Sequence, residues 1–188
     1  MPLSYVSENT AKGFDVELMI AFAREYGYKI DFVAVDFEAK LGGIASNKYD
    51  IAIGGITVTD ERREEMNFTV SYYESPVVMV TKGQDNAGST LSDLAGKKVG
   101  VMTASIQAVM MPELVPDAEY MEFNSISDMI AALNSNKIDA FGCDESLYTS
   151  MLWEGQAVDR IDEPIDKSNY GLIFQKGKKL ELQNEVNE

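Results

Sequence analysis

One short pattern occurs twice in this chain, and it limits the folds that the chain can adopt. A helix end, the motif Asn-Lys-x-Asp and a short apolar strand appear in IASNKYDIAIGG (44–55) and again in LNSNKIDAFGCD (133–144). The offset is 89 residues for both Asn47/Asn136 and Asp50/Asp139, which is too long for a solenoid repeat. The pattern indicates two α/β lobes built alike, and chance similarity is the alternative for so short a stretch.

The rest of the chain alternates between helical and strand patterns. Phe14, Leu18, Phe22 and Tyr26 recur at four-residue spacing, and Gly27 is a suitable helix stop. The pattern further predicts strands over 30–35, 50–53 and 97–102, helices over 37–46 and 125–135 (the second capped by Ser125 or Ser127), and a strand in 169–177 that leads into a helix. This alternation predicts βα units and mostly parallel sheets, with residues 82–96 as the polar connector into the second lobe.

Composition excludes several classes of function. A chain of 188 residues suits one ordinary domain or two small lobes, and its net charge of −15 argues against nucleic-acid and anionic-membrane partners. The single Cys143 allows no internal disulfide, and the absence of histidine excludes Ser-His, Cys-His and His-zinc chemistry. No apolar run approaches the ~18 residues that span a bilayer, and no signal peptide is visible. We therefore expect no metal and no cofactor.

Two strand ends are candidate ligand sites, because open α/β sheets bind ligands beyond the C-terminal ends of their strands. GGITVTDERR (54–63) offers glycines, threonine hydroxyls and Arg62, which can clamp a carboxylate with two hydrogen bonds. The second strand end offers Asp144, which can accept hydrogen bonds from an ammonium group. A cation and an anion together fit a zwitterion such as a free α-amino acid. Alternatively, Arg62 and Arg63 pair with adjacent carboxylates on a solvated helix start.

Four motifs resemble a known family over nearly the whole chain. GFDVEL, YDIAIGGITVTDERREEMNFTVSYYES, GKKVGV and IDAFGCDES are similar to the polar amino-acid-binding members of the family 3 periplasmic solute-binding proteins, which serve ABC importers. The resemblance implies an α/β, two-lobed periplasmic-binding-protein-like fold of type II, the Venus-flytrap fold. Lobe 1 would comprise residues 1–71 and 172–188, lobe 2 residues 77–168, and the hinge strands residues 72–76 and 168–171.

The resemblance also implies roles for individual residues. Arg62 would clamp the ligand α-carboxylate beside Thr57, the Gly55 backbone would contact the α-amino group, and Asp144 would hold the α-ammonium. The remaining expected ligand-binding residues are Phe37 and Ile56 in lobe 1, and Met102, Thr103, Ser105 and Ile106 in lobe 2.

The sequence departs from the family pattern in two places. The loop MTASIQA stands where many members are Gly-Thr-rich, so backbone donors remain but side-chain hydroxyls are lost. Met102, Ile106 and Cys143 would make that wall apolar, which favours an amino acid less polar than glutamine, histidine or arginine. The chain also resembles a family member trimmed at both termini. Strand addition at the missing N-terminal strand position is then one route to a homodimer.

We expect a substrate-binding component of an amino-acid ABC importer, not an enzyme, that captures a free α-amino acid between its lobes. Its partners would be that amino acid and the membrane permease. It would work in the periplasm or outside the cell, tethered to the membrane in its full-length form. A ligand-sensing extracellular domain of a signalling receptor is the alternative. A cyclohexadienyl-dehydratase-like enzyme is a second one, with Glu38, Cys143 and Glu145 as its candidate acid or base groups.

Overall fold

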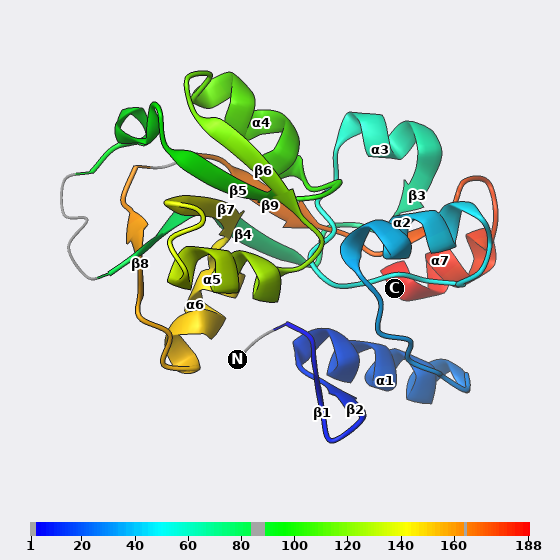
Figure 1. Cartoon of the computed structure of the whole chain (residues 1–188). Helices are drawn as coiled ribbons and strands as arrows, with labels where there is room; N and C mark the ends of the chain where they lie inside the picture. The colour runs from blue at the N-terminus through cyan, green and yellow to red at the C-terminus, as the bar shows by residue number, and fades with distance from the viewer. Residues whose placement is uncertain (1–2, 84–88, 164) are drawn as a thin grey trace. The chain divides into compact units, whose positions relative to one another are not determined.

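The computed structural model describes residues 3–83, 89–163 and 165–188, which form two compact units (Figure 1). Unit 1 comprises Met1–Glu74 and Ser168–Glu188, and unit 2 comprises Ser75–Lys167. The chain passes between the units inside strand β4 (Tyr73–Lys82) and inside strand β9 (Lys167–Tyr170), which pairs with β4. The predicted lobe boundaries, and the hinge role of residues 72–76 and 168–171, stay predictions.

Unit 1 has helices on both faces of a short antiparallel strand pair. Strands β3 and β10 pair with Ile173 opposite Phe68. Ile173 packs into a cluster with residues of α2, whereas Leu172 and Phe174 pack into a second cluster with residues of α1 and α7, as pleating requires. Its elements are β1 (Tyr5–Ser7), β2 (Thr10–Lys12), α1 (Phe14–Tyr26), α2 (Phe37–Ala45), α3 (Asp60–Glu65), β3 (Met66–Phe68), β10 (Ile173–Gln175) and α7 (Leu180–Asn187).

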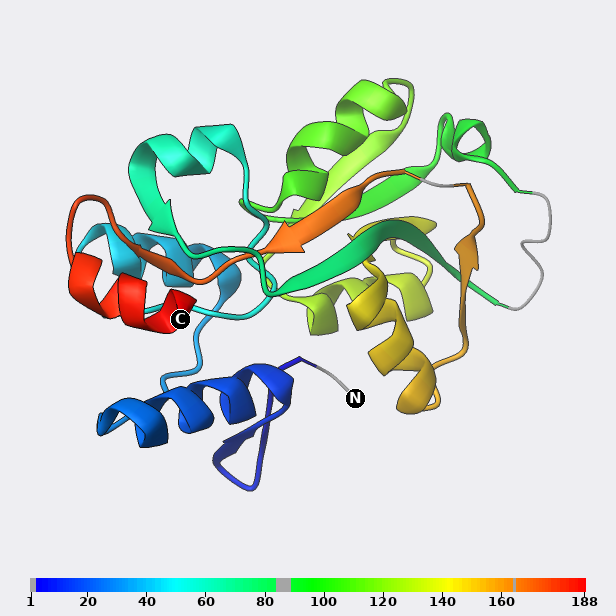
Figure 2. The same cartoon turned by 180° about the vertical axis from the view of Figure 1, so that it is seen from behind.

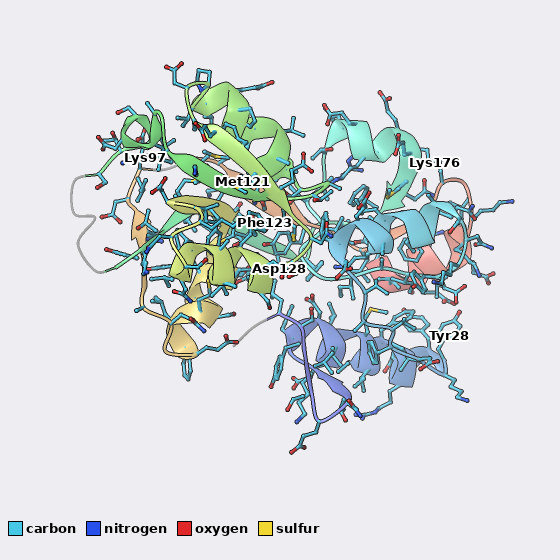
Figure 3. The ribbon with its side chains drawn as sticks, viewed as in Figure 1. Tyr28, Lys97, Met121, Phe123, Asp128 and Lys176 are labelled. Atoms are coloured by element: carbon cyan, nitrogen blue, oxygen red, sulfur yellow. The ribbon has the colours of Figure 1, made fainter. Side chains whose placement is uncertain are left out.

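Hydrogen bonds tie the two chain segments of unit 1 together. Tyr28, which follows α1, donates its hydroxyl proton to Glu185 on α7 at 2.6 Å (Figure 3).

The predicted helix that stops at Gly27 is confirmed, and Gly27 takes the left-handed φ of 73° that glycine tolerates.

Unit 2 is a three-layer α/β/α unit around the sheet β6-β5-β7-β4-β8 (Figures 1 and 2). Helix α4 covers one face, and helices α5 and α6 cover the other. Val78 and Val80 of β4 pack with α5 and α6, while Met79 between them packs with α4. The remaining elements are η1 (Leu91–Leu94), β5 (Lys98–Met102), α4 (Ile106–Leu114), β6 (Glu119–Phe123), α5 (Ile126–Asn134), β7 (Ala140–Asp144), α6 (Glu145–Trp153) and β8 (Val158–Ile161).

The expectation of mostly parallel sheets is wrong for both units. In unit 2, β5 is parallel to β6 and β7, but β4 is antiparallel to both β7 and β8. Strands β7 and β8, joined by α6, therefore run in the same direction, as a βαβ unit predicts. Strand β4, which enters from unit 1, lies between them and runs the other way. The pattern of helices and strands cannot reveal such an inserted strand.

Two predicted strands of unit 1 are absent from the described residues. Residues 28–36 form no strand, and within 50–53 only Ala52 forms an isolated bridge, to Ile173. Ile30 and Phe32 are partly buried against the core of unit 1, whereas Val33 on the other face is 59% exposed. A strand is completed by the hydrogen bonds of a neighbour, and no described segment forms a ladder with residues 28–36. The predicted strand in 169–177 is divided between β9 and β10.

The two copies of the repeated motif adopt the same helix end. Asn47 and Asn136 have φ of 58° and 57°. The following lysine amides donate to Gly43 and Ala132 at 2.8 Å in both copies. Asparagine tolerates this left-handed conformation better than most residues do, which accounts for its place just after each helix.

We predict that Asn47→Ala lowers the free energy of unfolding by about 1 kcal/mol, because alanine is strained at positive φ. Asn47→Gly is the matched control, and it should stay within about 0.5 kcal/mol of the wild type. Urea unfolding followed by circular dichroism measures both values. Equal stabilities of the alanine and glycine variants would contradict this account.

Candidate functional site

The loop 54–57 of unit 1 lies between the Ala52 bridge and helix α3. Gly54 and Gly55 both have positive φ, 108° and 65°, so the chain turns there in a conformation that suits glycine. The Ile56 side chain is fully buried in the core, so only its backbone can contact a ligand. Thr57 forms an isolated bridge with Tyr170. The loop therefore offers mainly backbone groups, and the ligand contact expected at Gly55 stays a prediction.

Arg62 is anchored at the end of this loop. Its Nη1 donates to the Thr57 carbonyl at 2.8 Å, and its backbone N–H donates to the Thr59 hydroxyl that caps α3. Its guanidinium carbon lies 5.5 Å from the Phe37 ring centroid. These contacts orient a partly buried guanidinium that can bind a carboxylate.

Arg63 has different partners from Arg62. This is expected if only Arg62 clamps a carboxylate. Its side chain is exposed and lies 5.8 Å from the Phe68 ring centroid. Its carbonyl accepts a hydrogen bond from Lys176, in the loop after β10 (Figure 3).

Lys40 is a further candidate site residue, and it was not predicted from the sequence. Its Nζ donates to the Gly54 carbonyl at 2.8 Å and lies 5.3 Å from the Phe37 ring centroid. Burial lowers the pKa of Lys40 to about 8, although the Asp15 charge opposes the shift. The available signal was its spacing, because residues i and i+3 of a helix share a face and Lys40 is three residues after Phe37 on α2.

A buried carboxyl group lies beneath the same loop. Asp15 on α1 is fully buried, and the Tyr72 hydroxyl donates to its Oδ1 at 3.1 Å, while Oδ2 has no hydrogen-bond partner among the described residues. Burial raises the pKa of Asp15 from 3.8 to about 6, against the effects of Tyr72 and Lys40. Burial and the Asp15 charge raise the pKa of Tyr72, and backbone hydrogen bonds to Gly54 and Gly55 oppose that shift. Asp15, Tyr72 and Lys40 thus all support loop 54–57.

In unit 2, the parallel pairing of β5 and β7 brings two predicted loops together. Because the strands are parallel, with Val99 opposite Ala140, the residues after them lie at the same edge of the sheet. Gln107 donates from Nε2 to Oδ1 of Asp144 at 2.9 Å, and both side chains are buried. Gln107 was not predicted from the sequence, although it follows β5, the strand next to β7, and so lies near this edge of the sheet.

The other predicted residues of unit 2 differ in their availability. The Ser105 hydroxyl caps α4 by accepting from the Ala108 N–H, and the Thr103 hydroxyl donates to the Phe123 carbonyl at 3.3 Å. Ile106, at the start of α4, and Met102 are partly buried, and Met102 packs against the core.

Cys143 is a correction to the predicted apolar wall. It is 3% exposed and belongs to the core cluster of unit 2. Its side chain points away from that of Asp144, because successive residues of a strand face opposite sides. Only Met102 and Ile106 of the three predicted wall residues remain candidates for ligand contact.

The groups considered for dehydratase chemistry have other surroundings. Burial raises the pKa of the Cys143 thiol well above its ordinary value, Glu145 pairs with Arg160, and Glu38 is exposed. Across residues 3–83, 89–163 and 165–188, no group of His, Cys, Asp or Glu is arranged to hold a metal ion. Over the same residues, no helix combines the length and apolarity needed to cross a membrane.

We predict that Asp15 makes stability depend on pH. Below pH 3.8 the carboxyl is neutral in both the folded and the unfolded state, whereas above about pH 6 folding must bury its charge. The stability advantage of Asp15→Asn over the wild type should therefore grow by about 2 kcal/mol between pH 4 and 7. Urea unfolding at each pH measures it, with the exposed Asp31→Asn as control. A constant difference across this range would refute the prediction.

Comparison with known proteins identifies the family. The bacterial extracellular solute-binding proteins, family 3, match residues 1–187. The arginine-binding extracellular protein ArtP of Bacillus subtilis (strain 168) is 35% identical over 141 residues, which are 74% of this chain. The chain spans 55% of the length of ArtP.

Two solved structures show the same fold. An ancestral arginine-binding protein bound to arginine has a TM-score of 0.90 and 29% identity, over 99% of this chain and 84% of that one. The amino acid ABC transporter substrate-binding protein AbpA of Streptococcus pneumoniae, bound to L-arginine, has a TM-score of 0.91 and 27% identity, over 99% and 81%. The predicted two-lobed periplasmic-binding-protein-like fold is confirmed, and the chain belongs to the bacterial extracellular solute-binding proteins of family 3.

Proposed function

We propose that the chain is the substrate-binding component of an amino-acid ABC importer and captures a free α-amino acid. The observation that carries the proposal is the anchoring of Arg62, whose guanidinium is held by the Thr57 carbonyl next to the Phe37 ring. A cation fixed in this way binds a carboxylate with little loss of side-chain entropy. The relatives named above support the proposal, because their names describe amino-acid binding.

Each predicted residue has a role in this proposal. Arg62 and Thr57 bind the α-carboxylate, the backbone at Gly55 and Ile56 lies along the ligand, and Phe37 packs on its side chain. Asp144, oriented by Gln107, accepts from the α-ammonium. The remaining contacts are made by the start of α4 and the loop before it, at Met102, Thr103, Ser105 and Ile106.

We further propose that the ligand contacts both units at once. Arg62 belongs to unit 1 and Asp144 to unit 2, and they would bind opposite ends of one zwitterion. A ligand that contacts both units binds a closed arrangement more tightly than an open one, and so shifts the population toward it. The closed form would then be presented to the membrane permease.

Family membership places the chain in the periplasm or outside the cell, and a membrane tether on the full-length protein is part of our proposal. Receptor sensing remains an alternative use of the same ligand site. We do not expect dehydratase activity, because the Cys143 thiol is enclosed in the core and Glu145 is paired with Arg160.

We predict that Arg62→Ala weakens amino-acid binding at least ~30-fold, because the α-carboxylate loses its charged partner. Arg63→Ala is the matched control, one residue away on the same helix, and it should stay within about twofold. A thermal-shift screen of the twenty amino acids identifies a ligand, and isothermal titration calorimetry measures the affinities. Full affinity in Arg62→Ala would refute the clamp, and Asp144→Ala tests the second half of the site in the same way.

A homodimer formed by strand addition is a further part of the proposal. Residues 28–36 belong to no strand, and Val33 and Val35 are 59% and 37% exposed. Such a segment can pair with the same segment of a second chain. We predict a light-scattering mass of two chains that falls to one chain in Val33→Pro, because proline removes a backbone donor. The mass of a single chain for the wild type would refute the dimer.

A further inference from the structure

We infer that the site selects an amino acid with a neutral or anionic side chain that accepts hydrogen bonds, such as glutamine or glutamate, and disfavours cationic side chains. The inference rests on the proposed function and deepens it. Its basis is the surroundings of the Phe37 ring, where the chain places two cations. Arg62 lies 5.5 Å and Lys40 lies 5.3 Å from the ring centroid.

Both cations are fixed by the same short loop. Arg62 donates to the carbonyl of Thr57 and Lys40 to the carbonyl of Gly54, each at 2.8 Å. If Arg62 binds the α-carboxylate, Lys40 is the cation left for the ligand side chain, at the other end of the loop. The Lys40 ammonium can donate to a carboxylate or to an amide oxygen there.

Asp15 is the charged neighbour of Lys40, and its carboxylate offsets part of the ammonium charge. Asp15 is fully buried, and one of its oxygens accepts from Tyr72. Lys40, in contrast, is only partly buried and reaches the ring that the ligand side chain is proposed to contact. The ammonium of Lys40 lies beside the ring, 5.3 Å from its centroid, whereas the Asp15 carboxyl is enclosed in the core of unit 1.

A cationic ligand side chain would be the third positive charge at one aromatic ring. It would compete with Lys40 and Arg62 for the negative face of the ring, and both would repel it. At an effective dielectric constant of about 20, repulsion between partly buried charges at ~7 Å raises a dissociation constant at least ~10-fold. The earlier expectation of a less polar amino acid considered only Met102, Ile106 and Cys143, and it left out this lysine.

The test is calorimetric titration of the 188-residue chain with L-glutamate, L-glutamine, L-arginine and L-lysine. We expect glutamine or glutamate to bind at least ~10-fold more tightly than arginine or lysine. Lys40→Met should reduce that ratio ~10-fold or more, whereas Lys40→Arg, which keeps the charge, should largely preserve it. Lys48→Met is the matched control, because Lys48 also lies over an aromatic ring of unit 1, 5.2 Å from the Tyr49 centroid. Its ratio should not change.

Three results would overturn the inference. Tight arginine binding that Arg62→Ala abolishes would overturn it and leave the proposed function standing. Absence of binding by all twenty amino acids would overturn both. An unchanged ratio in Lys40→Met, with circular dichroism and thermal unfolding like the wild type, would also exclude Lys40 as the selecting residue.

Discussion

Two backbone carbonyls of one loop, at Gly54 and Thr57, accept hydrogen bonds from two cationic side chains, and the candidate site in unit 1 depends on those bonds. A loop with two positive-φ glycines has little conformational preference of its own. Lys40 and Arg62 supply the restraint from outside the loop. Tyr72 and Asp15 support it from the core side, at the cost of enclosing a carboxyl group that would otherwise be hydrated.

In unit 2, the register of two parallel strands positions Asp144, the carboxylate of the proposed site. Parallel neighbours end at the same edge, so the start of α4 after β5 lies next to the end of β7. Gln107 bonds to Asp144 at this edge. The neutral amide of Gln107 donates to one oxygen of Asp144, and the binding of a ligand ammonium there stays a proposal.

Elements whose hydrophobic periodicity matches their burial were predicted correctly from the sequence. The predictions were wrong or incomplete where the structure depends on pairing with a distant segment, or on a long side chain that reaches a distant group. Helix α1 and the cap of α5 by Ser125 are as predicted, because amphipathic spacing and capping are local. Residues 28–36 alternate like a strand, yet they form none, because pairing requires a second segment. Arg62 was selected by its motif, and its role as a carboxylate clamp stays a prediction. Lys40 was not selected, because nothing local distinguishes an anchored lysine from a solvated one.

The overall charge of the chain and the local charges near loop 54–57 have opposite effects on an anionic ligand. A net charge of −15 would repel an anionic ligand at long range. Salt screens such fields over a Debye length of about 8 Å at physiological ionic strength. Partly buried charges within hydrogen-bonding reach are screened much less, so two anchored cations beside one ring outweigh a distant acidic surface. The surface charge then affects solubility and rates of encounter. On our proposal, the few groups around loop 54–57 set the affinity for one amino acid over another.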